Sequence, residues 1–124
     1  MLDGYKSYMA ASEAAYETDN TSRLGQYAVD PILSRVTRDI QANAAKGVIW
    51  RFHNVLNPQL QGWSKDKTLV VVLDCLQNLG SYEYSLANGA RVSTKKAANS
   101  YYQAHLKYVQ GVWKITDAKV GSQC

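Results

Sequence analysis

Residues 98–120 read ANSYYQAHLKYVQGVWKITDAKV, and this stretch decides the fold. Apolar and polar side chains alternate along both halves of the stretch, and Gln110-Gly111 lies between the halves. A period of two is typical of a strand that has one packed face and one wet face. The stretch therefore predicts two long strands joined by a tight turn, with an apolar side that other elements must cover.

The first 46 residues have helical rather than strand spacing. Apolar and aromatic side chains recur every three or four positions in this region, which predicts helices over residues 2–18, 21–28 and 30–46. Asp3 is the expected N-cap of the first helix, and Asp30-Pro31 has the residues that start the third. We expect three helices before any strand.

Further strands are predicted at Val48–Val55, Lys67–Gln77 and Tyr82–Leu86. The second of these is apolar on both faces, which favours a central position in the sheet. The expected connections are a polar loop around residues 61–64, a turn at residues 78–80 and an exposed mobile loop at residues 90–97. The predicted buried core consists of Trp50, Leu69, Val71, Leu73, Trp113 and Ile115, packed by Leu33, Val36 and Ile40.

Composition limits the classes of protein to which the chain can belong. Its 124 residues and 46% hydrophobic content predict a single domain, residues 1–124, with an ordered core. The formal net charge is +4, but the basic residues are scattered, which makes nucleic-acid binding an unfavoured function. No apolar run approaches the roughly 20 residues of a membrane-spanning helix.

Two cysteines give the most specific chemical prediction. Cys75 lies on a predicted strand and Cys124 is the last residue, so a disulfide between them would hold an end that otherwise frays. Closing a loop of about 50 residues is worth roughly 4 kcal/mol in the chain-entropy model. The alternative is two unrelated thiols. Metal binding is disfavoured, because no second Cys or His lies at ligand spacing from either one. A disulfide predicts an oxidising, extracytoplasmic compartment.

Several short motifs, together with the order of the elements, resemble the NTF2-like superfamily, also called SnoaL-like or cystatin-type cone proteins. The motifs are Ala45-Lys46-Gly47-Val48, Leu56-Asn57-Pro58, Asp74-Cys75 and the segment Gly111–Asp117. They look most like small secreted or lipid-anchored domains of actinobacteria, and the resemblance covers nearly the whole chain. It implies an α+β fold in which three N-terminal helices pack in a strongly curved antiparallel β-sheet. It also implies homodimerisation through the sheet, and a leader or anchor that we expect to lie outside these residues.

Candidate catalytic residues are few. In enzymes that this fold resembles, an Asp or His deep in the cone acts as a general base on an apolar substrate. Asp74 interrupts an apolar strand and is the best candidate, with Tyr84, His53 and His105 weaker. The structural alternative is that Asp74 accepts hydrogen bonds from the backbone or from Arg51. Both histidines lie on partly wet strand faces, which favours a surface position for each.

Aromatic residues are the candidates for a pocket. The predicted pocket residues are Tyr16, Tyr27, Trp50, Tyr102 and Trp113, for which simple core packing is the alternative. No cofactor or metal site is predicted, since the sequence has no phosphate loop, HExxH or CxxC element. The favoured function is a non-catalytic extracytoplasmic module that binds a small apolar ligand or a protein partner, or serves in envelope assembly. The alternative is a cofactor-independent isomerase, cyclase or hydrolase that uses Asp74 as its base and a tyrosine as its acid.

Overall fold

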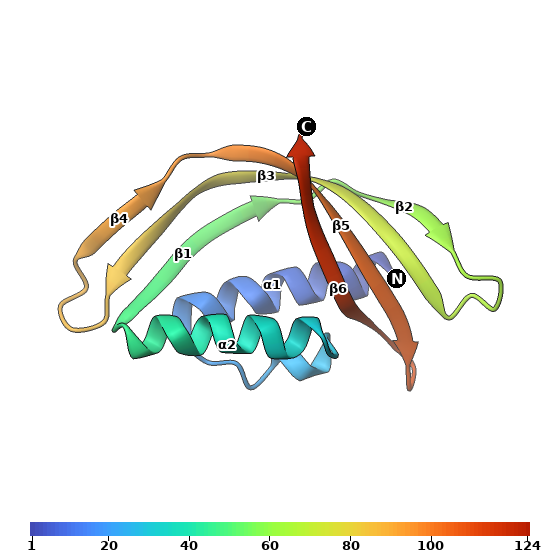
Figure 1. Ribbon diagram of the computed structural model, residues 1–124, viewed down its shortest axis with the longest axis horizontal. Coiled ribbons are helices and arrows are strands. Elements are labelled where there is room, and N and C mark those ends of the chain that lie inside the picture. The colour runs from blue at the N-terminus through green and yellow to red at the C-terminus, as the bar shows by residue number, and fades with distance from the viewer.

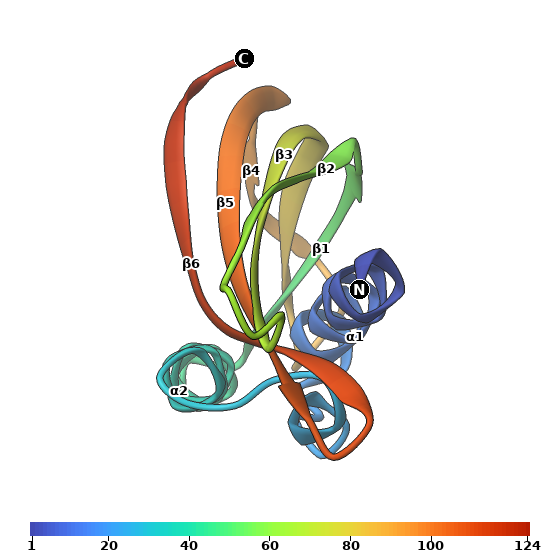
Figure 2. The same ribbon diagram turned by 90° about the vertical axis from the view of Figure 1, so that its right-hand side faces the viewer.

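The computed structural model describes all residues from 1 to 124 and has an α+β architecture. Two α-helices, α1 (Leu2–Thr18) and α2 (Ile32–Ala45), lie under an arched antiparallel sheet (Figures 1 and 2). The six strands are β1 (Val48–Val55), β2 (Pro58–Trp63), β3 (Leu69–Ser85), β4 (Arg91–Lys95), β5 (Ala98–Val109) and β6 (Val112–Gln123). The predicted α+β class and the curved antiparallel sheet are confirmed.

Strand β3 is the centre of the sheet. It is 17 residues long and pairs with β1 and β2 along one side and with β5 and β4 along the other. Strand β6 continues the sheet beyond β5. Residues 98–120 thus form the predicted hairpin, whose turn residues Gln110 and Gly111 have φ values of 48° and 85°.

A bulge in β3 changes which residues face the helices. Val70, Val72 and Asp74 are buried on the helix side, but the pairing with β1 shifts register between Phe52 and Asn54. Gly80 adopts φ 111° in the shifted part of β3, a conformation that favours glycine. A bulge bends a strand and redirects its side chains. The predicted turn at residues 78–80 is therefore wrong, because the chain remains paired through it.

The core lies between the helices and the concave side of the sheet. Tyr5 and Tyr8 from α1 and Ile32 from α2 pack there with Leu106 and Ile115 of the sheet. Buried residues of the main cluster are Tyr5, Tyr8, Met9, Ala28, Ile32, Val70, Val72, Leu76, Ala104, Leu106 and Ile115.

The predicted core is right in part. Ile115 and Ile40 are buried, whereas Leu69 is 49% exposed and Trp50 and Trp113 are half-buried. Val71 and Leu73 are half-buried as well, and Leu33 and Val36 pack partly buried against the core. The difference arises because β3 is apolar on both faces, so its periodicity does not show which face the helices cover.

The predicted second helix, residues 21–28, is instead one short 3-10 turn, Leu24–Gln26, so the chain has two α-helices rather than three. The Ile115 amide donates to the Tyr27 carbonyl, and the Val29 amide donates to the Ile115 carbonyl. The backbone after the turn is therefore paired with β6, and those bonds are not available to a helix. The N-cap of α1 is Met1, with no side-chain cap, rather than the predicted Asp3.

Two segments predicted as loops are strands. Residues 58–63 form β2, since their backbone pairs with residues 70–74 of β3. Residues 91–95 form β4 opposite residues 81–84, and all five of their side chains are exposed. Apolar alternation is absent from a strand that buries no side chain, so the sequence pattern could not show β4.

A disulfide joins Cys75 of β3 to Cys124, with the two Cα atoms 6.0 Å apart. The predicted pairing is therefore present in the structure. Neither helix has the length and the apolar character that crossing a membrane requires.

Candidate functional site

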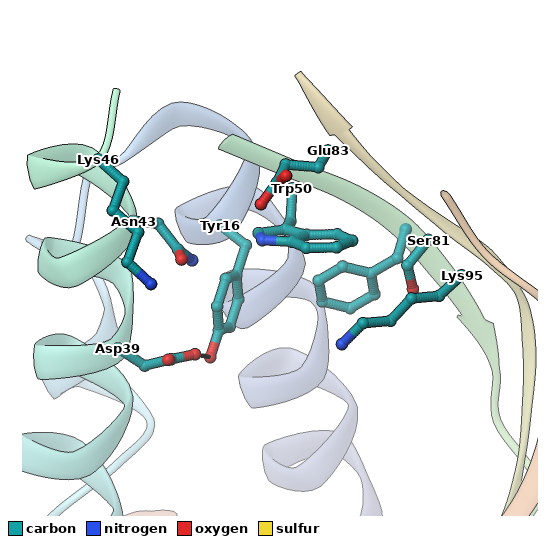
Figure 3. A pocket seen from close by; sticks show the side chains of 9 residues that line it. Tyr16, Asp39, Asn43, Lys46, Trp50, Ser81, Glu83 and Lys95 are labelled. Carbon is teal, nitrogen blue, oxygen red and sulfur yellow. Dashed lines mark hydrogen bonds between the residues drawn. The ribbon is translucent and has the colours of Figure 1, made fainter. Parts of the chain in front are cut away.

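An open cleft lies between the ends of the two helices and the concave side of the sheet (Figure 3). Its volume is about 380 Å³. The cleft is lined by aromatic, charged and uncharged polar side chains from five different elements or their ends. These are Tyr16, Asp39, Asn43, Lys46, Trp50, Phe52, Ser81, Glu83 and Lys95.

Three aromatic rings form the apolar part of the cleft. The Tyr16 and Phe52 rings meet edge to face with their centroids 5.6 Å apart. The Lys95 ammonium nitrogen lies 5.0 Å from the centroid of the Trp50 ring, which is cation–π distance. Figure 3 shows Tyr16 and Lys95 extending toward the same space from opposite walls. The rings thus line an open cleft, with a cationic side chain over one of them.

Charged groups of both signs surround these rings. The Tyr16 hydroxyl donates to Oδ2 of Asp39 at 2.5 Å, and the Ser93 hydroxyl donates to Oε1 of Glu83 at 3.2 Å. Burial and the hydrogen bond to Asp39 raise the pKa of Tyr16 well above its usual value, so the phenol stays protonated at neutral pH. Lys46 and Lys95 balance the two carboxylates. Tyr16 is therefore a hydrogen-bond donor in the cleft rather than a base.

Asp74 lies elsewhere, in the interior of the protein. Its side chain is completely buried, with Oδ2 accepting a hydrogen bond from the Tyr5 hydroxyl and Oδ1 one from the Asn57 amide, both at 2.7 Å. The Tyr102 ring packs 6.3 Å from the Tyr5 ring, centroid to centroid. Asp74 lines neither the cleft nor the groove beside α1. The residue that the sequence favours as a base is therefore closed off from solvent, and both of its carboxylate oxygens accept hydrogen bonds.

The alternative partner that the sequence suggests for Asp74, Arg51, is wrong. The Arg51 Nε lies 3.3 Å from Oε1 of Glu17, and its guanidinium lies 5.0 Å from the centroid of the Tyr84 ring. Tyr84 is thus engaged on β3, far along the strand from Asp74. The backbone partner, the Asn57 amide, is present as expected.

The two histidines lie on the surface. His53 has a side chain that is 65% exposed, with Nδ1 3.3 Å from Oε2 of Glu13. His105 is exposed on β5, opposite Asp117 of β6 in the sheet register. Neither is hydrogen-bonded to Asp74, which accepts from Tyr5 and Asn57 only. The weaker catalytic candidates are therefore not assembled around the main one.

The aromatic residues predicted to share a pocket are dispersed. Tyr16 and Trp50 line the cleft, whereas Tyr27 lines a separate groove beside α1. Tyr102 packs partly buried on the core, and Trp113 lies at the other end of the sheet against Trp63. The structure thus brings two of the five residues together.

Several residues of the cleft are absent from the sequence-based candidates. Phe52 could have been found, because it shares a strand face with Trp50 two residues away. Lys95 lies on β4, which was expected to be a loop, and Glu83 reaches the cleft only because of the bulge in β3. Asp39 and Lys46 carry no sequence signal beyond helix-surface charge.

Comparison with known proteins gives matches of structure and none of sequence. Neither a protein-family model nor a curated protein matches the sequence. The intermembrane space region of the chloroplast protein ARC6 is similar in structure, with a TM-score of 0.82 at 15% identity, over 98% of this chain and 93% of that chain. A protein with a cystatin-like fold from Caulobacter vibrioides has a TM-score of 0.56 at 10% identity, over 97% and 87%.

The fold is NTF2-like. The same fold occurs in the hexachlorocyclohexane dehydrochlorinase LinA-type3 from Novosphingobium barchaimii LL02, with a TM-score of 0.61 at 9% identity, over 99% of this chain and 88% of that chain. An enzyme is therefore among the structures that share the NTF2-like fold with this chain. Because one fold serves unrelated functions, the function of this chain has to be argued from its own residues.

Proposed function

We propose that this chain is a non-catalytic, extracytoplasmic binding module whose partner site is the cleft lined by Tyr16, Trp50 and Lys95. The proposal rests chiefly on one observation, the complete burial of Asp74 between Tyr5 and Asn57. A general base must come within hydrogen-bond distance of the proton it removes. Asp74 offers a substrate neither an open approach nor a free carboxylate oxygen.

The cleft has the composition of a site for a partner protein. Its rings supply the amphipathic contact area that dominates many interfaces, and its cations balance its carboxylates. A segment of polypeptide, which offers apolar side chains, backbone polar groups and charges of both signs, complements such a site. A purely apolar ligand would displace water from the charged groups of Lys46, Asp39 and Glu83 without offering them new partners, which costs binding energy.

Two findings support an extracytoplasmic location. The disulfide between Cys75 and Cys124 is a bond that persists in oxidising compartments and is rare in the cytosol. The structurally similar region of ARC6 is described as an intermembrane space region. An enzymatic role in the same compartment has no comparable support from the residues of this chain.

A peptide-selection experiment tests the proposal. A phage-displayed random peptide library is selected on the disulfide-bonded protein, and the affinity of a selected synthetic peptide is measured by fluorescence anisotropy. Trp50→Ala should weaken binding about tenfold or more, since buried tryptophan anchors are typical binding hot spots. The matched control is Trp63→Ala, the same change at the other end of the sheet, which should leave affinity within about twofold.

Two outcomes would contradict the proposed function. If Trp50→Ala and Trp63→Ala had the same effect, the cleft would not be the binding site. Turnover in a substrate screen that Asp74→Asn abolished, in protein shown by circular dichroism to be folded, would replace the binding proposal with the enzyme alternative.

A further inference from the structure

Exposed aromatic rings and lysines gather at the end of the sheet opposite the cleft. Trp63 at the end of β2 is 46% exposed and Tyr108 near the end of β5 is 48% exposed. Both rings contact Trp113, with centroids 6.2 Å and 5.3 Å away. This end lies at the right of Figure 1, where the β2–β3 and β5–β6 turns point away from the rest of the molecule. We call Trp63, Tyr108, Lys65, Lys67, Lys107 and Lys114 the aromatic–basic tip.

The two turns of the tip are joined and held in shape. The Tyr108 amide donates to the Thr68 carbonyl at 2.9 Å, which links β5 to the β2–β3 turn. Within that turn, Oδ1 of Asp66 accepts hydrogen bonds from the hydroxyls of Ser64 and Thr68 at 2.6 Å and 2.8 Å. The two turns that carry the rings and lysines are therefore ordered and linked. Along β5 and β6 the side chains alternate between the sheet faces, so Tyr108 and Trp113 share one face and Lys107 and Lys114 the other.

The lysines of the tip lack acidic partners. Lys107 and Lys114 lie directly opposite each other in the β5–β6 register, an arrangement of like charges that destabilises a sheet. None of the four lysines is in an ion pair, and the Lys114 ammonium donates instead to the Gly25 carbonyl at 2.9 Å. Asp66 lies in the β2–β3 turn, where its carboxylate accepts hydrogen bonds from Ser64 and Thr68. The excess of positive charge fits an anionic surface.

We propose that the aromatic–basic tip docks on the surface of an anionic lipid bilayer. Tryptophan and tyrosine favour the headgroup region, where the ring is apolar and the N–H or O–H is wet. Lysines near an anionic leaflet are attracted to it. The geometry favours lipid over nucleic acid, because the Trp63 and Trp113 rings meet at 79° and so do not form one flat platform for successive bases.

The experiment is co-sedimentation of the disulfide-bonded chain with vesicles. Vesicles of phosphatidylcholine alone are compared with vesicles that contain phosphatidylglycerol as well, at constant salt. Binding should require the anionic lipid. Lys65→Glu with Lys67→Glu should lower the apparent affinity more than tenfold, because each basic side chain near an anionic surface is worth about fivefold. Trp63→Ser should lower it severalfold, and Trp63→Phe should restore part of the loss.

The matched control is Lys96→Glu with Lys119→Glu, which makes the same change in net charge at exposed positions outside the tip. This control should bind within about twofold of the unchanged chain. Thermal unfolding of each variant shows whether it is folded. Equal losses in both double variants, or no binding to anionic vesicles, would overturn the proposal. Binding to duplex DNA that matched vesicle binding and ignored Trp63→Ser would show a general polyanion surface and overturn it too.

Discussion

Two tyrosine–aspartate pairs in this protein have the same chemistry and opposite surroundings. Tyr5 donates to Asp74 in the interior, and Tyr16 donates to Asp39 in the cleft. Both tyrosines belong to α1, where a separation of eleven residues is close to three turns and places them on one face, roughly 16 Å apart. The interior pair is enclosed by Tyr102 and the sheet, whereas the cleft pair meets solvent. Accessibility, rather than residue type, distinguishes the two pairs.

The pairs also differ in what their loss should cost. A buried carboxylate needs every one of its hydrogen bonds, because no water can replace a missing donor. Asp39 lies on the exposed side of α2, where water is available. Substitutions at the two pairs test whether the interior is filled and the cleft open.

The largest expected effect is that of Tyr5→Ala. It removes a fully buried ring and one of the donors to Asp74, and should lower the free energy of unfolding by about 3–5 kcal/mol. Tyr16→Ala, at a half-buried ring, should cost about 1–2 kcal/mol. Urea denaturation followed by circular dichroism measures both. Equal costs would mean that the two pairs are equally enclosed.

A smaller difference is expected for the carboxylates. Asp74→Asn should cost about 1–3 kcal/mol, because the new amide group turns one of two acceptor oxygens into a donor that faces a donor. Asp39→Asn should cost less than about 1 kcal/mol. The same denaturation measurement compares the costs of the two substitutions. If Asp74→Asn left the free energy of unfolding unchanged, water would have to reach the interior.

High pH should destabilise the interior through its phenols. Burial raises the pKa of Tyr8 to about 12, and burial together with the bond to Asp74 raises the pKa of Tyr5 further. A raised phenol pKa stabilises the fold below pH 10, and that stability is lost as pH rises through the folded pKa. The raised pKa of Tyr8 alone should lower the free energy of unfolding by on the order of 1 kcal/mol at pH 11.

Denaturation midpoints at pH 9 and pH 11, with phenolate absorbance recorded in parallel, test this prediction. Tyr8→Phe should reduce the loss between the two pH values. Phenols of the interior that ionised near pH 10 without unfolding would show that solvent enters.

The smallest expected effect lies in the cleft. Lys95→Met keeps an unbranched side chain but removes the charge that lies over Trp50. It should change the free energy of unfolding by less than about 1 kcal/mol. The peptide that binds the cleft should respond to this change more strongly than the fold does. A stability loss above about 2 kcal/mol would make Lys95 a structural residue rather than a binding residue.

The sequence could predict those elements that have one face toward the core and one face toward water. The hairpin of residues 98–120 followed from its alternation and from the Gln110-Gly111 turn, and α2 followed from its apolar stripe. Strand β4 could not be predicted, because every one of its side chains is exposed. Its pairing with β3 depends on backbone groups, which every sequence has.

The candidate site was predictable to a similar extent. Tyr16 and Trp50 could be identified as pocket residues from their type alone. Their neighbours Glu83 and Lys95 reach the cleft through the bulge in β3 and the pairing of β4, and neither feature has a periodic signal. The strand pattern placed Asp74 on the same face as Val70 and Val72, but it did not show that this face is the one the helices cover. The hydrogen bond from the Tyr5 hydroxyl to Asp74 could be known only from the packing of α1.

The disulfide has a mechanical consequence. It connects Cys124, which follows β6, directly to β3, the central strand, past the intervening strand β5. A force that pulls on Cys124 is therefore transmitted to Cys75, and the residues between them, including all of β4, β5 and β6, form a covalent loop that bears no tension. Without the bond, the same force would peel β6 from the sheet edge one hydrogen bond at a time. With the disulfide formed, force on Cys124 therefore cannot separate β6 from β5 step by step. It has to pull β3 out of the sheet instead.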